Sequence, residues 1–256
     1  MIRAILFDLD NTVLDFPRRS DARRLFRAGA QRCYAYLSAH ELALPPFETF
    51  CRRQRRISRR VNFVTWLTGG EPDGRRMLRR LCRDYRLQRD ETCLAKLGWC
   101  WYEPIAATAE LADDVIPTLT ALREAGLALG LVVNTSHQGA VIDSHLSDLG
   151  LLEFFPVRAY SSEIGAQKPW PHLYLHALEQ LGLPPGRTMF VGDEPKTDLS
   201  GAKRLGMKTV LRSADHSRRA LRYADDAINR ISELLDILQI ATAPSTRATP
   251  IPALMV

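Results

Sequence analysis

Short apolar runs alternate with longer segments of helical periodicity along most of the 256-residue chain. Five runs have the length and composition of buried strands: AILF, LALGLVV, VRAY, TMFVG and KTVLR. Hydrophobic residues recur at helical spacing around residues 114–125, 138–149, 171–182, 197–206 and 229–240. Strands that alternate with helices predict a parallel sheet with helices on both faces, so the expected fold class is α/β.

Residues 17–106 interrupt this alternation soon after the first run, and they contain no strand pattern. Stretches such as RRLFRAGAQRCYAYLSAH and GRRMLRRLCRDYRLQ place arginines on one helical face and Leu, Cys and Tyr on the other. We therefore expect an α/β core formed by residues 1–16 and 107–240, with an all-helical insert at residues 17–106. The last segment, residues 241–256, is rich in Pro, Thr and Ala and is expected to be disordered.

The charge distribution also sets the insert apart. The whole chain carries a net charge of +6, whereas residues 17–100 alone hold 19 Arg and one Lys against eight acids. Two dense arginine runs lie at residues 52–60 and 75–83. A solvated helix face explains them better than nucleic-acid binding, because no nucleic-acid motif accompanies them and few aromatic residues interleave with them. Nucleic-acid binding through the insert is the less favoured alternative.

The cysteines and the apolar segments bear on the cellular compartment. The five cysteines are scattered and never form a CxxC pair, which favours reduced thiols over disulfides or a zinc site. The N-terminus has no secretory signal pattern, and no apolar run approaches the roughly 18 residues of a membrane span. We therefore expect a cytoplasmic protein without membrane contact, either a monomer or a homodimer.

Polar and charged side chains follow the apolar runs, where each strand ends. Asp8 and Asp10 follow the first run one residue apart, so both project to the same side of the chain. The later runs are followed by Asn134, Thr135, Ser136, Lys168, Asp193 and Asp198. Because the carboxyl ends of parallel strands share one edge of a sheet, we expect these residues along one crevice. Clustered carboxylates coexist around a hard divalent cation, and oxygen ligands with open positions favour Mg²⁺.

Four stretches, in this order, resemble the motifs of the haloacid dehalogenase superfamily of hydrolases: DLDNT, VVNTS, the lysine of GAQKPWP, and GDEPKTD followed by LSGA. The resemblance implies a Rossmann-like parallel sheet core with helices on both faces. The position of the insert is similar to that of the all-helical cap domain in one branch of the family. Asp10 matches an acid that the carbon–halogen-cleaving members lack, because a halide needs no proton. The resemblance therefore implies a phosphatase.

The resemblance also implies a role for each motif residue. Asp8 is expected to be the nucleophile that forms an aspartyl-phosphate, and Asp10 the general acid that afterwards acts as the base. Mg²⁺ is expected between Asp8, Asp193 and the backbone carbonyl of Asp10. Asp198 is expected to orient Lys168 or a metal-bound water from the second shell of ligands. The residues expected on the phosphate side are Thr12, Asn134, Thr135 and Lys168.

Two positions depart from the family pattern. Val133 occupies the position of a hydroxyl residue that binds phosphate, and the missing hydrogen bond corresponds to about 1.5–3 kcal/mol. Thr135, Ser136 or backbone N–H groups can compensate for this loss. Trp170 replaces an aspartate that is common after the Lys-Pro of the third motif, and this change is expected to alter the loop more than the chemistry.

The sequence thus predicts a Mg²⁺-dependent phosphate-monoester hydrolase that acts on a small phosphorylated metabolite. Val133 keeps one alternative open, a phosphate-binding or scaffolding pseudoenzyme of the same fold. The substrate itself is not identified, because in this architecture the cap residues that face the site set the specificity.

Overall fold

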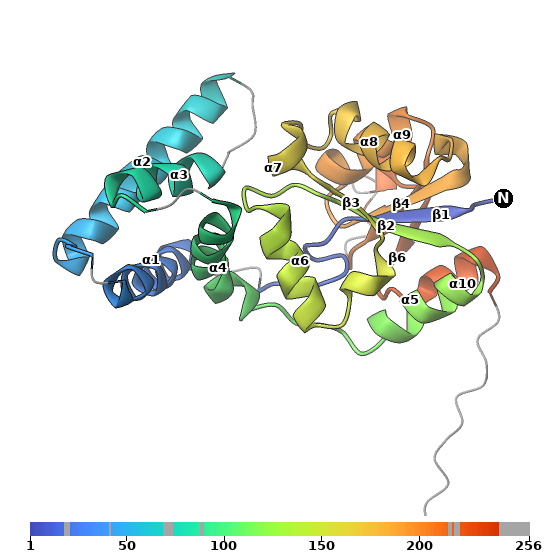
Figure 1. Cartoon of the computed structure of the whole chain (residues 1–256). Helices are drawn as coiled ribbons and strands as arrows, with labels where there is room; N and C mark the ends of the chain where they lie inside the picture. Colours follow the sequence, from blue (N-terminus) through green and yellow to red (C-terminus); the bar gives the residue numbers. More distant parts are fainter. Residues whose placement is uncertain are drawn as a thin grey trace, which may run out of the picture.

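A six-stranded parallel sheet with strand order β3-β2-β1-β4-β5-β6 lies at the centre of the core (Figure 1). The strands of this computed structural model are β1 (Ala4–Phe7), β2 (Ala128–Val133), β3 (Val157–Tyr160), β4 (Thr188–Gly192), β5 (Lys208–Arg212) and β6 (Asp226–Ile228). The structure describes residues 1–17, 21–40, 42–68, 74–87, 90–214, 217 and 221–240, and only the backbone of residues 61–68. The predicted parallel sheet is confirmed. The tail expected to be disordered lies outside the described residues.

Helices cover both faces of the sheet, as the alternation predicted (Figure 1). Ile5 and Phe7 of β1 belong to the hydrophobic cluster on one face, and Leu6 belongs to the cluster on the other. The first face carries α5 (Val115–Glu124), α6 (Gly139–Asp148) and α10 (Glu233–Leu238). The second face carries α8 (Pro171–Leu181) and α9 (Ser200–Arg204), and the short α7 (Ser161–Ile164) follows β3. Because β1 is central and buried on both sides, the residue after it emerges in the middle of the carboxyl edge.

Three elements differ from the expected pattern. The strand β6 has only three residues and begins with an acid, so its hydrophobic signal is too short to stand out. The helix expected at 197–206 is divided into a π-helical turn, Pro195–Leu199, and α9. The helix expected at 229–240 begins at Glu233, whose carboxylate accepts hydrogen bonds from the N–H groups of Asn229 and Arg230 and holds the preceding residues in a turn. Short 3₁₀ turns cover Leu152–Phe154, Pro185–Arg187 and Leu221–Tyr223.

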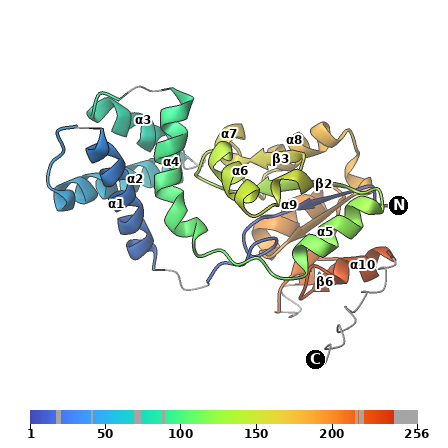
Figure 2. The ribbon, with the colours of Figure 1, turned by 60° about the horizontal axis from the view of Figure 1, so that its bottom comes forward.

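The insert consists, in its described part, of α1 (Ala22–Ala39), α2 (Phe47–Thr68), α3 (Gly74–Asp84) and α4 (Glu91–Ala106). These helices enclose a hydrophobic cluster of their own. Asp21 and Asp90 cap α1 and α4, since their carboxylates accept hydrogen bonds from backbone N–H groups in the first turn. In Figures 1 and 2, α1–α3 lie away from the sheet and α4 lies next to α6. Although α2 has 22 residues, neither it nor any other described helix has the apolar length to cross a membrane.

Helix α4 joins the insert to the core. The Tyr102 hydroxyl lies 3.0 Å from Nδ1 of His145 on α6, and the Tyr102 ring packs on His137 with ring centroids 4.9 Å apart. Gly98 approaches α6 so closely that a Cβ atom there would lie 2.9 Å from Val141. The insert therefore rests on the segment that follows β2.

The two chain segments that enter and leave the insert pair with each other. The Asp15 N–H donates to the Glu110 carbonyl at 2.9 Å, and the Glu110 N–H donates to the Asp15 carbonyl at 2.8 Å. We call residues 15–17 and 107–110 the paired linkers. They form the second connection between the insert and the core.

Candidate active site

The carboxyl ends of β1, β2 and β4 bring the predicted residues together. Asp8, Asn134 and Asp193 each follow one of these three adjacent strands directly. Lys168 reaches the same point from the loop before α8: its Nζ contacts the Asp8 carboxylate and lies 2.8 Å from Oδ1 of Asp198. Asp8, Lys168 and Asp198 are only 7%, 3% and 2% exposed. The first, third and fourth motifs thus meet in one buried cluster.

The charges in this cluster stabilise one another against the cost of burial. Burial raises the pKa of Asp8, Lys168 opposes this effect, and the charges of Asp198 and Asp10 add to the rise. For Lys168, burial by itself lowers the pKa, but Asp198 and Asp8 outweigh burial and raise it above its usual value. Lys168 is therefore always an ammonium group, and it neutralises only part of the negative charge around it.

Asp193 adds a further carboxylate to the cluster. Carboxylate oxygens of Asp8, Asp193 and Asp198 all lie within 4.8 Å of one another. Burial, followed by the charge of Asp198, raises the pKa of Asp193 to about 7. This set of hard oxygen donors with excess negative charge fits a divalent cation such as Mg²⁺. Asp198 already accepts hydrogen bonds from Lys168 and, at 3.0 Å, from the Glu194 N–H, so Asp8 and Asp193 are the better-placed ligands.

A single turn after β1 carries Asp10 and Thr12. The N–H groups of residues 12–14 all approach the Leu9 carbonyl, at 2.9–3.3 Å. Asp10 is exposed on the crevice, yet the protein around its carboxyl raises its pKa, mainly through partial burial and against the effect of Lys168. Thr12 is fully buried, and its hydroxyl has no hydrogen-bond partner among the described residues. The turn therefore presents an acid to the crevice and buries a hydroxyl behind it.

Side chains hold the loop after β2. The Asn134 side chain donates to the Lys168 carbonyl at 3.1 Å and accepts from the Lys168 N–H at 2.8 Å. Asn134 thus holds the lysine backbone in place, and its amide group is already engaged. Ser161 Oγ accepts from the Thr135 N–H at 2.8 Å, and Thr135 Oγ1 accepts from the His137 N–H at 3.1 Å. The Thr135 hydroxyl can still donate a hydrogen bond to an acceptor, whereas both polar atoms of the Asn134 side chain are already engaged.

The two departures from the motif pattern lie in different environments. Val133, the last residue of β2, is 3% exposed and belongs to the cluster on the α5–α6 face. Trp170 is 62% exposed, and its N–H donates to the Gln167 carbonyl at 2.9 Å. Val133 therefore lies at the site without a polar group, whereas Trp170 points to solvent.

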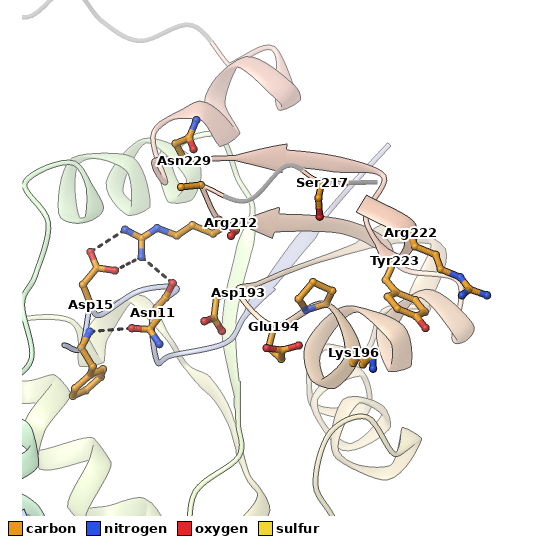
Figure 3. A pocket seen from close by; sticks show the side chains of 14 residues that line it. Asn11, Asp15, Asp193, Glu194, Lys196, Arg212, Ser217, Arg222, Tyr223 and Asn229 are labelled. Carbon is orange, nitrogen blue, oxygen red and sulfur yellow. Dashed lines mark hydrogen bonds and ion pairs between the residues drawn. The ribbon is translucent and has the colours of Figure 1, made fainter. Parts of the chain in front are cut away.

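A polar groove of about 1270 Å³ opens next to Asp193 (Figure 3). Asn11 and Asp193 line one end, and Arg212, Lys196 and Tyr223 line it across the ends of β5 and β6. Figure 3 shows Arg212 reaching from the end of β5 toward Asn11 and the linker. The candidate metal ligand Asp193 therefore lies in the wall of an accessible groove.

The family model of haloacid dehalogenase-like hydrolases matches residues 2–206, which include all four motifs. The chain belongs to the haloacid dehalogenase-like hydrolase family. The family expected from the motifs is thus confirmed.

Relatives of this hydrolase cover nearly its whole length. Glyceraldehyde 3-phosphate phosphatase of Methanopyrus kandleri is 30% identical over 93% of this chain and 98% of that protein. Ribulose-1,5-bisphosphate 5-phosphatase of Halopiger xanaduensis is 27% identical over 93% of this chain and 100% of that protein. The crystal structure of a phosphatase from Thermococcus onnurineus has a TM-score of 0.58 at 25% identity and covers 93% of this chain and 99% of that one. The similarity therefore extends through the insert.

Sequence reasoning misses three residues that shape the site of this hydrolase. Asn11 has a positive φ of 54° and lines the groove beside Asp193, and its place inside DLDNT was an available signal. Arg212 ends the apolar run KTVLR, where a charged residue after a buried strand was a second signal. Ser161 gave no signal, because a serine at the end of a strand is common and its partner, Thr135, is 26 positions away.

Proposed function

We propose that the protein is a Mg²⁺-dependent phosphatase that hydrolyses monoesters of a small phosphorylated metabolite through an aspartyl-phosphate on Asp8. The observation that carries the proposal is the buried Asp8 carboxylate, paired with Lys168 and grouped with Asp193 and Asp198. The two relatives named above are phosphatases of glyceraldehyde 3-phosphate and of ribulose 1,5-bisphosphate, which supports the substrate class.

In the first step, an oxygen of ionised Asp8 attacks phosphorus, and the bond between phosphorus and the ester oxygen breaks. Lys168 holds Oδ1 of Asp8, which leaves Oδ2 to attack. Asp10 gives its proton to the departing alkoxide. The raised pKa of Asp10 suits this role, because more of the acid is protonated near neutral pH than for an ordinary aspartate.

In the second step, ionised Asp10 takes a proton from a water molecule whose oxygen attacks phosphorus. The bond between phosphorus and Asp8 breaks, and inorganic phosphate leaves. Asp10 is exposed on the crevice, so water can reach it. The cycle ends with Asp8 ionised and Asp10 protonated, as it began.

The other motif residues hold these groups in place. Asp8, Asp193 and the Asp10 carbonyl would hold Mg²⁺, which supplies positive charge that offsets the repulsion between carboxylates and phosphate. Lys168 neutralises part of the same charge, and Asp198 orients it through their 2.8 Å contact. On the phosphate side, we propose Thr135 as the side-chain donor. Thr12, which is fully buried, is proposed to hold the loop after the nucleophile. Asn134 is proposed to contribute through the backbone of Lys168.

We also propose that residues 17–106 form the cap and that residues 1–16 and 107–240 form the hydrolase core. The separate hydrophobic cluster of α1–α4 and the paired linkers support this division. The cap is then the source of substrate discrimination.

Val133 supports a second candidate function, a pseudoenzyme that binds phosphate without efficient turnover. Nucleic-acid binding by the insert has less support, because several of its arginines pair with acids of the insert. Arg53 lies 2.9 Å from Asp84, and Arg32 lies 3.0 Å from Glu103. Such pairs reduce the charge available to a polyanion.

The proposal is tested with a panel of phosphorylated sugars, nucleotides and small acids, assayed with Mg²⁺ and after its removal by EDTA. We expect turnover that requires Mg²⁺ and a phosphoryl group on the peptide that contains Asp8 after acid quenching. The variant Asp8→Asn keeps the shape of the side chain but not its nucleophilic oxygen, so kcat should fall by a factor of about 10³ or more.

A matched control is Asp148→Asn, which removes the same charge from an exposed position on α6. The control should keep the activity of the parent. Equal turnover by parent and Asp8→Asn would contradict the assignment of the nucleophile. Phosphate binding without turnover of any substrate would favour the pseudoenzyme.

A further inference from the structure

Arg212, the last residue of β5, makes a two-pronged contact with the Asp15 carboxylate. Its Nη2 donates to Oδ2 of Asp15 at 2.9 Å, and its Nη1 donates to Oδ1. The same Nη1 donates to the Asn11 carbonyl at 2.9 Å, and Figure 3 shows these contacts as dashed lines. The Arg212 side chain is only 12% exposed. A planar guanidinium that forks a carboxylate fixes the orientation of both groups.

Both partners of Arg212 belong to segments that matter to the reaction. Asp15 is the residue at which the paired linkers exchange two backbone hydrogen bonds with Glu110, so it lies where the cap joins the core. Asn11 lies between Asp10 and Thr12, and its Oδ1 accepts a hydrogen bond from the Phe16 N–H at 3.1 Å. Arg212 is therefore bound to the residue directly after the general acid and to the residue at which the cap joins the core.

Asn11 lies in the same groove wall as Asp193. Its backbone has a left-handed conformation with φ of 54°. Figure 3 shows the Asn11 carbonyl directed to Arg212 while the side-chain oxygen accepts from the Phe16 N–H. A shift of the Asn11 backbone would consequently move the adjacent Asp10, both its carboxyl group and its backbone carbonyl.

We propose that Arg212 is a positioning residue that holds the Asp10 turn and the base of the cap in one fixed arrangement. Its functional consequence rests on the proposed phosphatase function. Arg212 touches neither the phosphoryl group nor the metal in this arrangement: it acts through Asn11 and Asp15. One side chain thereby fixes both the position of the acid and the position of the cap.

The variant Arg212→Lys tests this proposal while it keeps the positive charge. A lysine has a single nitrogen and cannot fork Asp15 and reach Asn11 with the same geometry. Arg230→Lys is the matched control, because Arg230 likewise forms ion pairs with aspartate, Asp113 and Asp114, but at an exposed position of the core. Both variants change an arginine that is paired with aspartate, and only Arg212 adjoins the site.

The first measurement needs no substrate. Hydrogen–deuterium exchange of peptides that cover residues 8–16 and 107–112 should become faster in Arg212→Lys and remain unchanged in Arg230→Lys. Mn²⁺ binding, followed by electron paramagnetic resonance, should weaken about tenfold in Arg212→Lys, because the Asp10 carbonyl, a proposed metal ligand, belongs to the turn that Arg212 holds. These two results decide the proposal even if the parent has no phosphatase activity, in which case only the proposed function fails.

Kinetics separate a positioning role from a purely structural one. We expect kcat of Arg212→Lys to fall about tenfold or more, since small displacements of reacting groups have effects of this size, while KM changes less than threefold. The double variant Arg212→Lys with Asp15→Asn should be no slower than Arg212→Lys alone, because both changes remove the same contact. Unchanged exchange, Mn²⁺ affinity and kcat in Arg212→Lys, or equal effects in Arg230→Lys, would overturn the proposal.

Discussion

At the scale of single residues, the main feature of the site is that positive side chains are few beside the aspartates that follow β1 and β4. Lys168 is the one cation in direct contact with Asp8 and Asp198 among the described residues. The position that a hydroxyl would occupy next to it is Val133, which is buried in an apolar cluster. Val133 therefore offers no side-chain donor at the position where the motif pattern has a hydroxyl.

The variant Val133→Thr tests whether the missing hydroxyl limits the reaction. Valine and threonine have nearly the same shape, so the change should fit the end of β2, although it adds a polar group. A hydroxyl that bonds a phosphate oxygen more strongly in the transition state should raise kcat/KM by up to about tenfold. Steady-state kinetics on the best substrate of the panel measure this change.

The neighbouring substitution Val132→Thr is the control for that measurement. Val132 lies on the opposite face of β2, in the cluster with Leu6 and Phe190. The hydroxyl that Val132→Thr introduces therefore cannot reach the crevice. It should give no gain in kcat/KM. If Val133→Thr gives no gain either, Thr135, Ser136 or backbone groups already provide the missing donor.

At the scale of elements, the insert that we propose as the cap contacts the loop that holds Lys168 in place. Helix α3 begins at Gly74, whose N–H donates to the Ser136 carbonyl at 3.1 Å. A Cβ atom on Gly74 would lie 2.2 Å from that carbonyl oxygen. The same loop carries Asn134 and Thr135, so the position of the cap and the order of this loop are coupled by direct contact.

We therefore expect Gly74→Ala to disturb the cap contact. The added methyl group must displace either α3 or the loop, and overpacking of this kind costs about 1–3 kcal/mol. Hydrogen–deuterium exchange over residues 134–138 should become faster, and kcat/KM should fall. Gly186→Ala is the control, because a Cβ atom at that position meets no atom within 4 Å. Unchanged exchange in Gly74→Ala would mean that the cap is not in contact with this loop in solution.

At the scale of the whole molecule, the phosphatase consists of a parallel α/β core and a helical insert (Figures 1 and 2). In the described part of the chain, helix α4, the start of α3 and the paired linkers connect the two. The insert is strongly basic, and the remainder of the chain is net acidic. Acids of the core meet at the carboxyl edge of the sheet, where they repel one another unless protons or a cation are bound. The stability of the whole fold should consequently depend on both pH and Mg²⁺.

Asp193 determines the sign of this dependence. Its pKa is about 7 in the folded protein and about 3.8 for an unperturbed aspartate, so the folded state binds this proton more tightly. The stability that this protonation confers is present below about pH 4 and is lost as the pH rises through 7. Above pH 7 the Asp193 carboxyl is mostly ionised, so Mg²⁺ binds it without displacing a proton. The increase in Tm caused by Mg²⁺ should therefore be larger at pH 8 than at pH 6.

Differential scanning fluorimetry with Mg²⁺ or EDTA at the two pH values measures this difference. Asp193→Asn serves as the control variant, because it removes the titrating group and a ligand. It should lose most of the Mg²⁺ effect and its pH dependence. An equal Mg²⁺ effect at pH 6 and pH 8 in the parent would contradict the role given to Asp193.

The order of strands and helices and the placement of Asp8, Lys168 and Asp193 at strand ends follow from the sequence by itself. The reason is that burial imposes a period of two on strands and of 3.6 on helices, and parallel strands end at one edge. The motifs then identified the family, because their order along the chain is a one-dimensional signal. The short strand β6 escaped this reasoning, since three residues carry too little periodicity.

Only the tertiary structure decided which polar groups meet. Arg212 and Asp15 are 197 positions apart, and no local pattern in either segment favours the other. Asn134 lies beside the phosphate motif in sequence, but in space its amide binds the backbone of Lys168, 34 positions away. Local periodicity indicates which side chains are buried. The partner of a buried polar group depends instead on how separate elements pack, and this packing is determined by the whole chain.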